Sequence, residues 1–238
     1  MKKTVLLFVL FITASLLAQE VRSVQFFSDY SMPNVKRLNV NKIDAVGGGL
    51  KISFKIDEDS DLDFNFGYQL FSIQQDSALA RWNWDFWEIR YKNRIASDLI
   101  ERPGLAVSLN PIQKMDVYPV YLTLSHRVKI TDGLKIIPKI GGGLMFYTRR
   151  MYLEEEWQKR FDSTFTFEYS YRNFATNKIG NPIFVTMGLT IDYSIGDYID
   201  ISAGSEFRHI FRTPGKFGFD QFVFNDALSV KLGITFLY

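Results

Sequence analysis

The C-terminal stretch of the chain alternates apolar and polar side chains with a period of two. Small or polar residues stand at 229, 231, 233 and 235, and the apolar positions between them are Leu228, Val230, Leu232, Ile234, Phe236 and Tyr238. This period is the pattern of a β-strand with one apolar and one polar face. The strand runs to a final aromatic residue, although chain ends usually fray into water. A soluble sheet seldom needs a large aromatic side chain at that position.

Similar alternation predicts an all-β chain. The predicted strands cover residues 21–31, 46–56, 62–70, 117–130, 134–146, 183–193, 199–207 and 226–238. Short turns at 57–61, 131–133 and 196–197 join three pairs of strands, and long connections join the others. Eight antiparallel strands with both termini on one side produce this regular change between long and short connections. If residues 84–93 and 105–109 also span, the count becomes ten.

Two long connections, 73–116 and 149–181, contain further patterns. Residues 93–102 are suited to a short helix, and 105–109 to a short strand. Aromatic residues alternate from Phe165 to Tyr171, which indicates a β-ribbon that projects beyond the main strands. We expect both connections to lie on the same side of the sheet, opposite the three short turns.

The polar face of the strands is rich in glycine and carries charges of both signs. A narrow eight-stranded lumen needs small side chains. Enclosed charges must pair, because an isolated buried charge is prohibitively costly. The polar face is therefore predicted to line the lumen, and the apolar face to point outward. The predicted lumen charge network consists of Lys51, Lys139, Asp192, Glu206, Arg208 and Lys231.

The closing strand and the hairpin from Tyr118 to Tyr147 resemble those of the small outer-membrane β-barrel proteins of Gram-negative bacteria. The resemblance implies a closed, antiparallel, up-and-down transmembrane barrel. It also implies that the barrel-assembly machinery reads the ending at Phe236 and Tyr238, where the family usually ends in Phe. Contact with outer-membrane lipid and lipopolysaccharide and a monomeric state are expected on the same ground.

The first residues are predicted to form a secretory signal peptide over 1–18. Two lysines precede an apolar stretch, and Ala18 is a small residue suited to cleavage. A spanning helix would need about 20 apolar residues, so an uncleaved anchor is the weaker interpretation. Residues 19–238 then form a single barrel domain with equal numbers of basic and acidic side chains, which gives no indication of a nucleic-acid partner.

Candidate catalytic chemistry is sparse. The chain has no cysteine and two histidines, His126 and His209. Some outer-membrane barrels deacylate lipid A with a Ser placed two residues after a His, whereas here Val128 and Phe211 stand at those positions. Ser125 directly precedes His126, so its side chain points to the other face of the strand. We therefore expect no catalytic residue.

The connections hold two other candidate sites. The aromatic cluster Trp82, Trp84, Phe86 and Trp87 is either part of an interfacial girdle or a loop that binds a ligand or another surface. The acidic runs at 57–61 and 154–156 do not match the EF-hand loop, and solvated loop charge is the favoured interpretation. No metal or cofactor is expected.

The function predicted from the sequence is an outer-membrane β-barrel with a structural or surface-binding role and no catalysis. A pore is doubtful, because side chains fill the interior of eight-stranded barrels. Two alternatives remain open: a secreted, soluble, lipocalin-like carrier barrel and a lipid-A-modifying enzyme of the outer membrane.

Overall fold

Eight long antiparallel strands form a closed barrel in the computed structural model, which describes residues 20–34, 37–161, 165–211 and 221–238. The barrel strands are β1 (Val21–Pro33), β2 (Val40–Lys55), β3 (Ser60–Gln75), β4 (Leu105–His126), β6 (Leu134–Arg160), β9 (Ile183–Ser194), β10 (Ile199–Ile210) and β11 (Asp226–Leu237). Among the described residues, no helix is both long enough and apolar enough to cross a membrane. The predicted signal peptide, 1–18, lies outside the described residues.

Hydrogen-bonded pairs run around the whole ring. The strand order is β4-β3-β2-β1-β11-β10-β9-β6, and β4 also pairs with β6, which closes the barrel. The predicted count of eight is therefore confirmed, and the alternative of ten is wrong. Residues 86–91 are helical, and 105–109 belong to the start of β4, because β4 and β6 continue far past the barrel wall.

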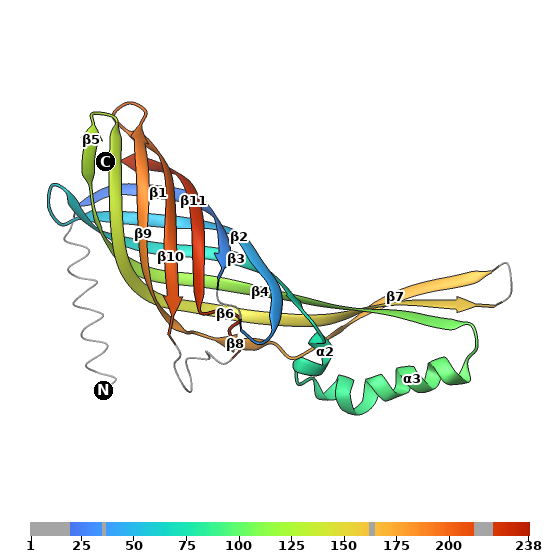
Figure 1. Cartoon of the computed structure of the whole chain (residues 1–238). Coiled ribbons are helices and arrows are strands. Elements are labelled where there is room, and N and C mark those ends of the chain that lie inside the picture. The colour runs from blue at the N-terminus through green and yellow to red at the C-terminus, as the bar shows by residue number, and fades with distance from the viewer. Residues whose placement is uncertain (1–19, 35–36, 162–164, 212–220) are drawn as a thin grey trace.

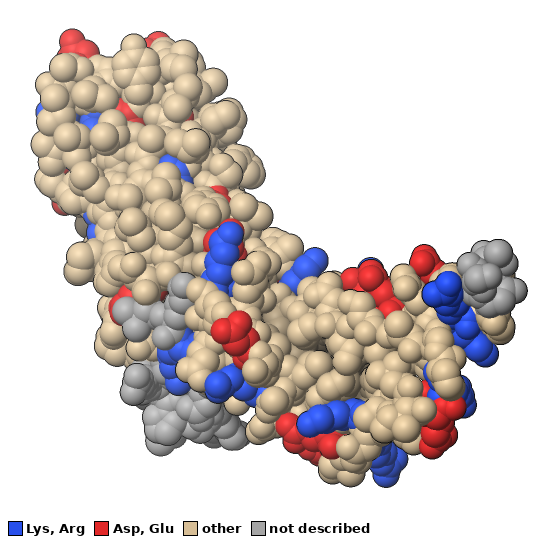
Figure 2. Space-filling view, turned by 45° about the vertical axis from the view of Figure 1, so that its right-hand side comes forward, with Lys and Arg blue, Asp and Glu red and all other residues tan. Residues whose placement is uncertain are grey.

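The apolar side chains point outward from the barrel, as predicted. On β11, Leu232 is 60% exposed whereas the neighbouring Lys231 is 8% exposed. Val46 on β2 and Met187 on β9 show the same outward exposure. Figure 2 shows few charged side chains over the barrel strands. This arrangement is the reverse of a soluble carrier barrel, so the lipocalin-like alternative is wrong.

One mouth of the barrel is filled by an apolar core. Phe222, Val223 and Phe224, which precede β11, are buried there. The ring of Phe224 lies 5.3 Å from that of Phe71, and the ring of Phe222 lies 5.0 Å from that of Tyr147, between ring centroids. The segment 221–225 therefore closes the interior at the end opposite the short turns.

Glycine in β6 permits a close approach of β4. A Cβ atom on Gly141 would lie 1.9 Å from the carbonyl oxygen of Leu122, and one on Gly143 would lie 2.2 Å from that of Val120. A side chain at either position would push the two strands apart. Gly141 and Gly143 therefore permit the close approach of the β4 and β6 backbones, in addition to keeping the lumen narrow.

Strands β4 and β6 run out of the barrel into a separate structure, which we call the arm (Figure 1). The arm contains residues 105–112 of β4, 152–160 of β6 and the strand β7 (Thr166–Phe174), which pairs with β6. Three helical segments accompany this sheet: α2 (Ala78–Arg81), the π-helix η1 (Phe86–Tyr91) and α3 (Lys92–Glu101). The β-ribbon and the helix expected in the two long connections are both present in it.

Two short strands complete the fold. Strand β8 (Lys178–Gly180) pairs with β6 where the chain returns from the arm to the barrel. Strand β5 (Val128–Thr131) forms a hairpin with the start of β6 at the other end of the molecule. The C-terminus lies at the end that carries β5, and the arm projects from the opposite end (Figure 1).

Candidate functional site

The centre of the lumen holds an ionic cluster around Glu206. The Glu206 carboxylate lies 2.8 Å from Arg208 Nε, 2.8 Å from Lys231 Nζ and 3.2 Å from Lys139 Nζ. The hydroxyl of Tyr121 donates to the same carboxylate at 3.1 Å. One buried anion thus faces three buried cations, and the pairing offsets the cost of removing these charges from water.

The other two residues predicted for the network lie nearer the short turns. Lys51 and Asp192 are buried in the lumen, at 8% and 4% exposure. Asp192 accepts a hydrogen bond from Ser202 and lies within electrostatic range of Lys51. Four of the six predicted residues therefore form one cluster, and Lys51 and Asp192 form a second polar layer. With the apolar mouth above them, these layers fill the interior.

The arm has its own apolar core, and the tryptophan cluster is part of it. Trp82, Trp84 and Trp87 are at most 8% exposed and pack with residues of β6 such as Leu153 and Trp157. Only Phe86 of the predicted cluster is exposed, at 41%. The three tryptophans thus form neither an interfacial girdle nor an exposed binding loop, which were the two interpretations of the sequence. The rings are buried because α2 and η1 fold them against the sheet, which the sequence pattern did not indicate.

A buried carboxylate joins the helices of the arm to its sheet. Glu155 is fully buried, whereas solvated loop charge was expected for this acidic run. Tyr91 of η1 donates to it at 2.7 Å, Trp157 Nε1 donates at 2.8 Å, and Asn173 of β7 also donates. Burial, and then the hydrogen bond to Glu155, raise the pKa of Tyr91. A signal for this burial was present in the sequence, because Glu155 lies at an alternate position of the strand and so shares a face with Met151, Leu153 and Trp157.

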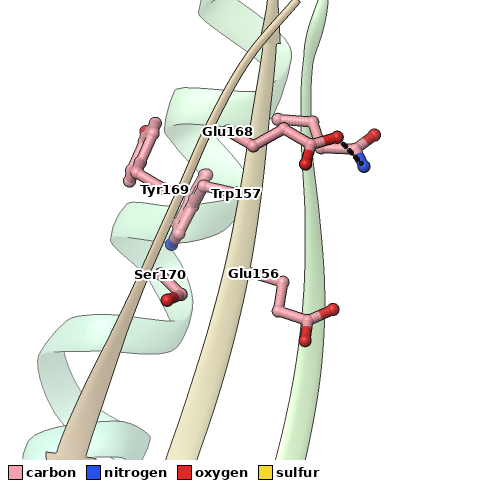
Figure 3. Close-up of a pocket in the computed structure, with 6 residues that line it drawn as sticks. Glu156, Trp157, Glu168, Tyr169 and Ser170 are labelled. Carbon is pink, nitrogen blue, oxygen red and sulfur yellow. Dashed lines mark hydrogen bonds between the residues drawn. The ribbon is translucent and has the colours of Figure 1, made fainter.

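The opposite face of the arm sheet is polar and open. A shallow pocket of about 350 Å³ lies along β6 and β7, lined by Glu156, Trp157, Gln158, Glu168, Tyr169 and Ser170. Figure 3 shows the carboxylates of Glu156 and Glu168 on one side of β6 and the rings of Trp157 and Tyr169 on the other. Gln158 donates to Glu168 at 3.1 Å. Carboxylate, amide and hydroxyl groups here offer hydrogen bonds to a polar partner.

A second pocket lies between α3 and the sheet. It has a volume of about 250 Å³, and its lining includes Arg94, Arg102, Asp98, Tyr169 and Tyr171. Arg102 Nη2 lies 3.5 Å from Asp98 Oδ1, so one of the two guanidinium groups already has an anionic neighbour. Figure 2 shows that charged side chains gather on the arm and not on the barrel. The polar surface available for binding is therefore concentrated in the arm.

Both histidines have polar neighbours but no complete catalytic set. His209 Nδ1 lies 2.6 Å from Asp226 Oδ1, and His126 Nδ1 lies 3.2 Å from the Ser60 hydroxyl. A nucleophilic serine needs a histidine that is oriented by a third group. Within the described ranges, His126 makes no hydrogen bond to a carboxylate and His209 makes none to a hydroxyl. The pairing of Ser60 with His126 was missed by the sequence analysis, because it depends on the register of β3 and β4.

The predicted assembly residues lie at the end of the closing strand. Phe236 is 40% exposed and Tyr238 is 80% exposed, both on the outer surface. Phe236 pairs in register with Val24 of β1, and the backbone N–H of Tyr238 donates to the carbonyl of Arg22 at 2.9 Å. Tyr238 is therefore hydrogen-bonded to β1 through the backbone.

No protein-family model and no curated protein matches the sequence. Among solved structures, Neisserial surface protein A is similar at 11% identity, with a TM-score of 0.46 over 91% of this chain and 96% of that chain. Ail of Yersinia pestis in complex with the heparin analogue sucrose octasulfate is similar at 11% identity, with a TM-score of 0.42 over 92% and 99%. A major outer membrane protein from Thermus thermophilus is similar at 11% identity, with a TM-score of 0.40 over 90% and 99%.

With TM-scores below 0.5, these likenesses assign no function to this chain. Its class rests on its own strands and surface, namely a closed antiparallel ring with apolar side chains outside and charged side chains inside. Lipid requires that every backbone polar group be satisfied within the protein, and a closed ring of strands does so. The chain is an eight-stranded β-barrel of the membrane-spanning kind.

Proposed function

We propose that this chain is an outer-membrane β-barrel protein that anchors the arm and displays it at the cell surface for binding. The barrel contacts outer-membrane lipid and lipopolysaccharide through its apolar exterior. It is inserted by the barrel-assembly machinery after export by the signal peptide over 1–18. The role is one of binding and not of catalysis.

The observation that carries this proposal is the arm itself. It has a core of tryptophan and aliphatic side chains separate from the core of the barrel mouth. Strands β4 and β6 are continuous from barrel to arm, so the arm is held on the barrel by the strands themselves. A structure with its own core at the end opposite the short turns is suited to present a surface to the outside.

The filled lumen argues against transport as the main role. The charge cluster at Glu206 and the apolar mouth formed with Phe222 and Phe224 occupy the space that a solute would need. Eight-stranded barrels have an interior just wide enough for side chains. Among the described residues, the arm offers the polar surface that can meet a partner.

Cysteine labelling on intact cells tests the display of the arm. The chain contains no cysteine, so single substitutions report one site each. We expect Ser108→Cys, at an exposed position of β4 within the arm, to react with a membrane-impermeant maleimide in intact cells. The matched control is Asp132→Cys, in an exposed short turn, which should react only after the outer membrane is permeabilised. Labelling of the control alone in intact cells, or of neither site before permeabilisation, contradicts the proposal.

A further inference from the structure

Strand β7 lies at the edge of the arm sheet, and its second side has no partner strand among the described residues. In the part of the chain that the structure describes, β6 is the only strand that pairs with β7. The backbone N–H of Ala175 donates to Met151 at 3.0 Å, and that of Phe161 donates to Phe165 at 3.1 Å. Hydrogen-bonded and non-hydrogen-bonded residue pairs alternate along an antiparallel ladder. These two bonds therefore show which residue pairs between β6 and β7 are hydrogen-bonded.

The free groups of β7 follow from that alternation. Odd-numbered residues such as Tyr169 and Tyr171 direct their N–H and C=O groups toward β6. Even-numbered residues therefore direct theirs outward, and these include Glu168, Ser170 and Arg172. All three are exposed. An unpaired row of this kind is a template for pairing with another strand.

The sequence of this edge is complementary to itself. If two β7 strands run antiparallel with Ser170 opposite Ser170, Glu168 of each copy stands opposite Arg172 of the other. Opposite charges directly across a ladder stabilise it, and like charges destabilise it. Centring the pair on Glu168 or on Arg172 would instead place two like charges face to face. Ser170 is thus the centre that the charges favour.

The backbone hydrogen bonds and the aromatic side chains also favour the register centred on Ser170. With Ser170 at the centre, each even-numbered residue of one copy stands opposite an even-numbered residue of the other. The outward N–H and C=O groups of the two copies therefore meet as hydrogen-bonded pairs. Tyr169 of one copy stands opposite Tyr171 of the other, on the face that already carries the stacked pair of Trp157 and Tyr169. Cross-strand aromatic pairs add to the stability of a sheet.

The existing contacts leave room for the new ones. Arg172 reaches Glu154 through Nε and Nη2, at 2.9 and 2.7 Å, so Nη1 takes part in neither bond. Glu168 accepts from Gln158 through Oε1, which leaves Oε2. Both side chains can therefore meet a second copy without giving up the bonds they make within their own arm.

We propose that two copies of this chain pair through the free edges of β7, antiparallel and with a twofold axis at Ser170. The proposal names the partner for the binding role of the arm, on which it rests. A self-complementary patch is what a twofold interface requires. The sequence analysis expected a monomer, and this proposal differs from it because the free groups of β7 follow from its register with β6.

Disulfide trapping tests the pairing in full-length protein purified in detergent. Residues opposite each other in a hydrogen-bonded pair have Cα atoms about 5.5 Å apart, within the range that a disulfide spans. Ser170→Cys should form a disulfide-linked dimer on mild oxidation. The matched control is Ser108→Cys, because Ser108 and Ser170 both pair with Glu156 and lie on opposite edges of the same sheet. A monomeric Ser170→Cys protein, or equal cross-linking of the control, overturns the proposal.

A charge exchange tests the register. In the Ser170→Cys background, Glu168→Arg alone and Arg172→Glu alone should each reduce the cross-linked fraction roughly tenfold, because both ion pairs become repulsive. Mixing the two variants should restore cross-linking, since every opposed pair in the mixed dimer is again of opposite sign. No loss in the single variants, or no recovery on mixing, overturns the register. Heat-modifiability on gels verifies that each barrel is folded.

This result is independent of membrane topology. Cross-linking of purified protein together with maleimide labelling only after permeabilisation would retain the dimer and reject surface display. Surface labelling with no cross-linked dimer would do the opposite. The two proposals therefore fail separately.

Discussion

The guanidinium of Arg149 lies over the ring of Trp82, 4.6 Å from the ring centroid, where the barrel meets the arm. Arg149 Nη2 also donates to Gln113 at 2.6 Å and to Gln75 at 3.2 Å. One buried side chain on β6 thus contacts Trp82, the residue that follows the first helix of the arm, and side chains on β3 and β4. It is a junction between the two parts.

Replacing Arg149 by Met should loosen that junction. The substitution removes the cation–π contact and leaves the buried amide oxygen of Gln113 without its Arg149 donor, at a cost of about 1–3 kcal/mol, whereas Gln75 still accepts from Gln113 Nε2. We expect faster proteolysis within 76–104 and a shift in tryptophan fluorescence, with the barrel still heat-modifiable. The control is Arg150→Met, at the neighbouring and half-exposed position, where a change within about 0.5–1 kcal/mol is expected. Equal sensitivity of the two variants would contradict the role of Arg149.

Removing the carboxylate of Glu155 should unfold the arm without unfolding the barrel. In Glu155→Ala, the donors on Tyr91, Trp157 and Asn173 lose their acceptor inside the core. Limited proteolysis should then cut the arm well before the barrel, which remains heat-modifiable. Glu156→Ala changes the next residue on the open face and should stay within about 0.5 kcal/mol of the unchanged protein. An arm that resists protease as well in Glu155→Ala would show that this carboxylate is dispensable.

The arm should lose stability at alkaline pH through Tyr91. Its pKa in the folded arm is raised above the ordinary value of 10.0. The unfolded chain therefore releases this proton first, so the contribution to stability is full below about pH 10 and falls as the pH rises above it. Protease digestion of the arm should accelerate as the pH rises from about 10 to about 12, relative to digestion of an unrelated unfolded substrate. Tyr91→Phe should flatten that dependence, and an unchanged slope would assign it to other groups.

Neutralising Glu206 should destabilise the barrel more than any surface change of the same kind. Glu206→Gln leaves Arg208, Lys231 and Lys139 as buried cations without their anion. Breaking a buried ion pair in this way costs about 3–5 kcal/mol. Urea titration of the folded band on unheated gels measures the effect. Glu58→Gln, in an exposed turn, is the matched control, and a midpoint for Glu206→Gln equal to that of the control would contradict the cluster's role.

Deleting Leu237 and Tyr238 should block assembly but not export. The deletion removes the hydrogen bond from Tyr238 to Arg22 and shortens the seam between β11 and β1. An unpaired edge is not tolerated in lipid. Cell fractionation should find the truncated chain in the periplasm or degraded, with heat-modifiability lost. Normal amounts in the outer membrane would show that Tyr238 is not needed as part of an assembly signal.

The barrel was predictable from the sequence because alternation reports directly on a two-faced strand. Leu232 outside and Lys231 inside follow from parity alone. The ion-pair partner of Lys231 was harder to predict, because its contact with Glu206 depends on the register of β10 against β11. Parity places both side chains in the lumen, and only the register brings them together.

The arm was less predictable, because the same tryptophan-rich sequence is compatible with an interfacial girdle, an exposed binding loop or a buried core. Trp82 and Trp87 are core residues because the helical segments pack against β6, which is distant in the sequence. The apolar run Phe222 to Phe224 carried a signal that the sequence analysis did not use. An uninterrupted apolar run in a connection otherwise rich in polar residues is evidence for burial.

The continuity of β4 and β6 has a mechanical consequence. Their ladder extends without interruption from Ser125 paired with Lys139 to Leu105 paired with Lys159. At 27 residues, β6 is more than twice as long as the roughly 9–11 residues that a strand needs to cross a bilayer. A pull on the tip of the arm along this ladder acts parallel to the strands, so its hydrogen bonds share the load in shear and do not open one after another. Tension applied to the arm is thus transmitted through the ladder of β4 and β6 into a closed cylinder held by the membrane.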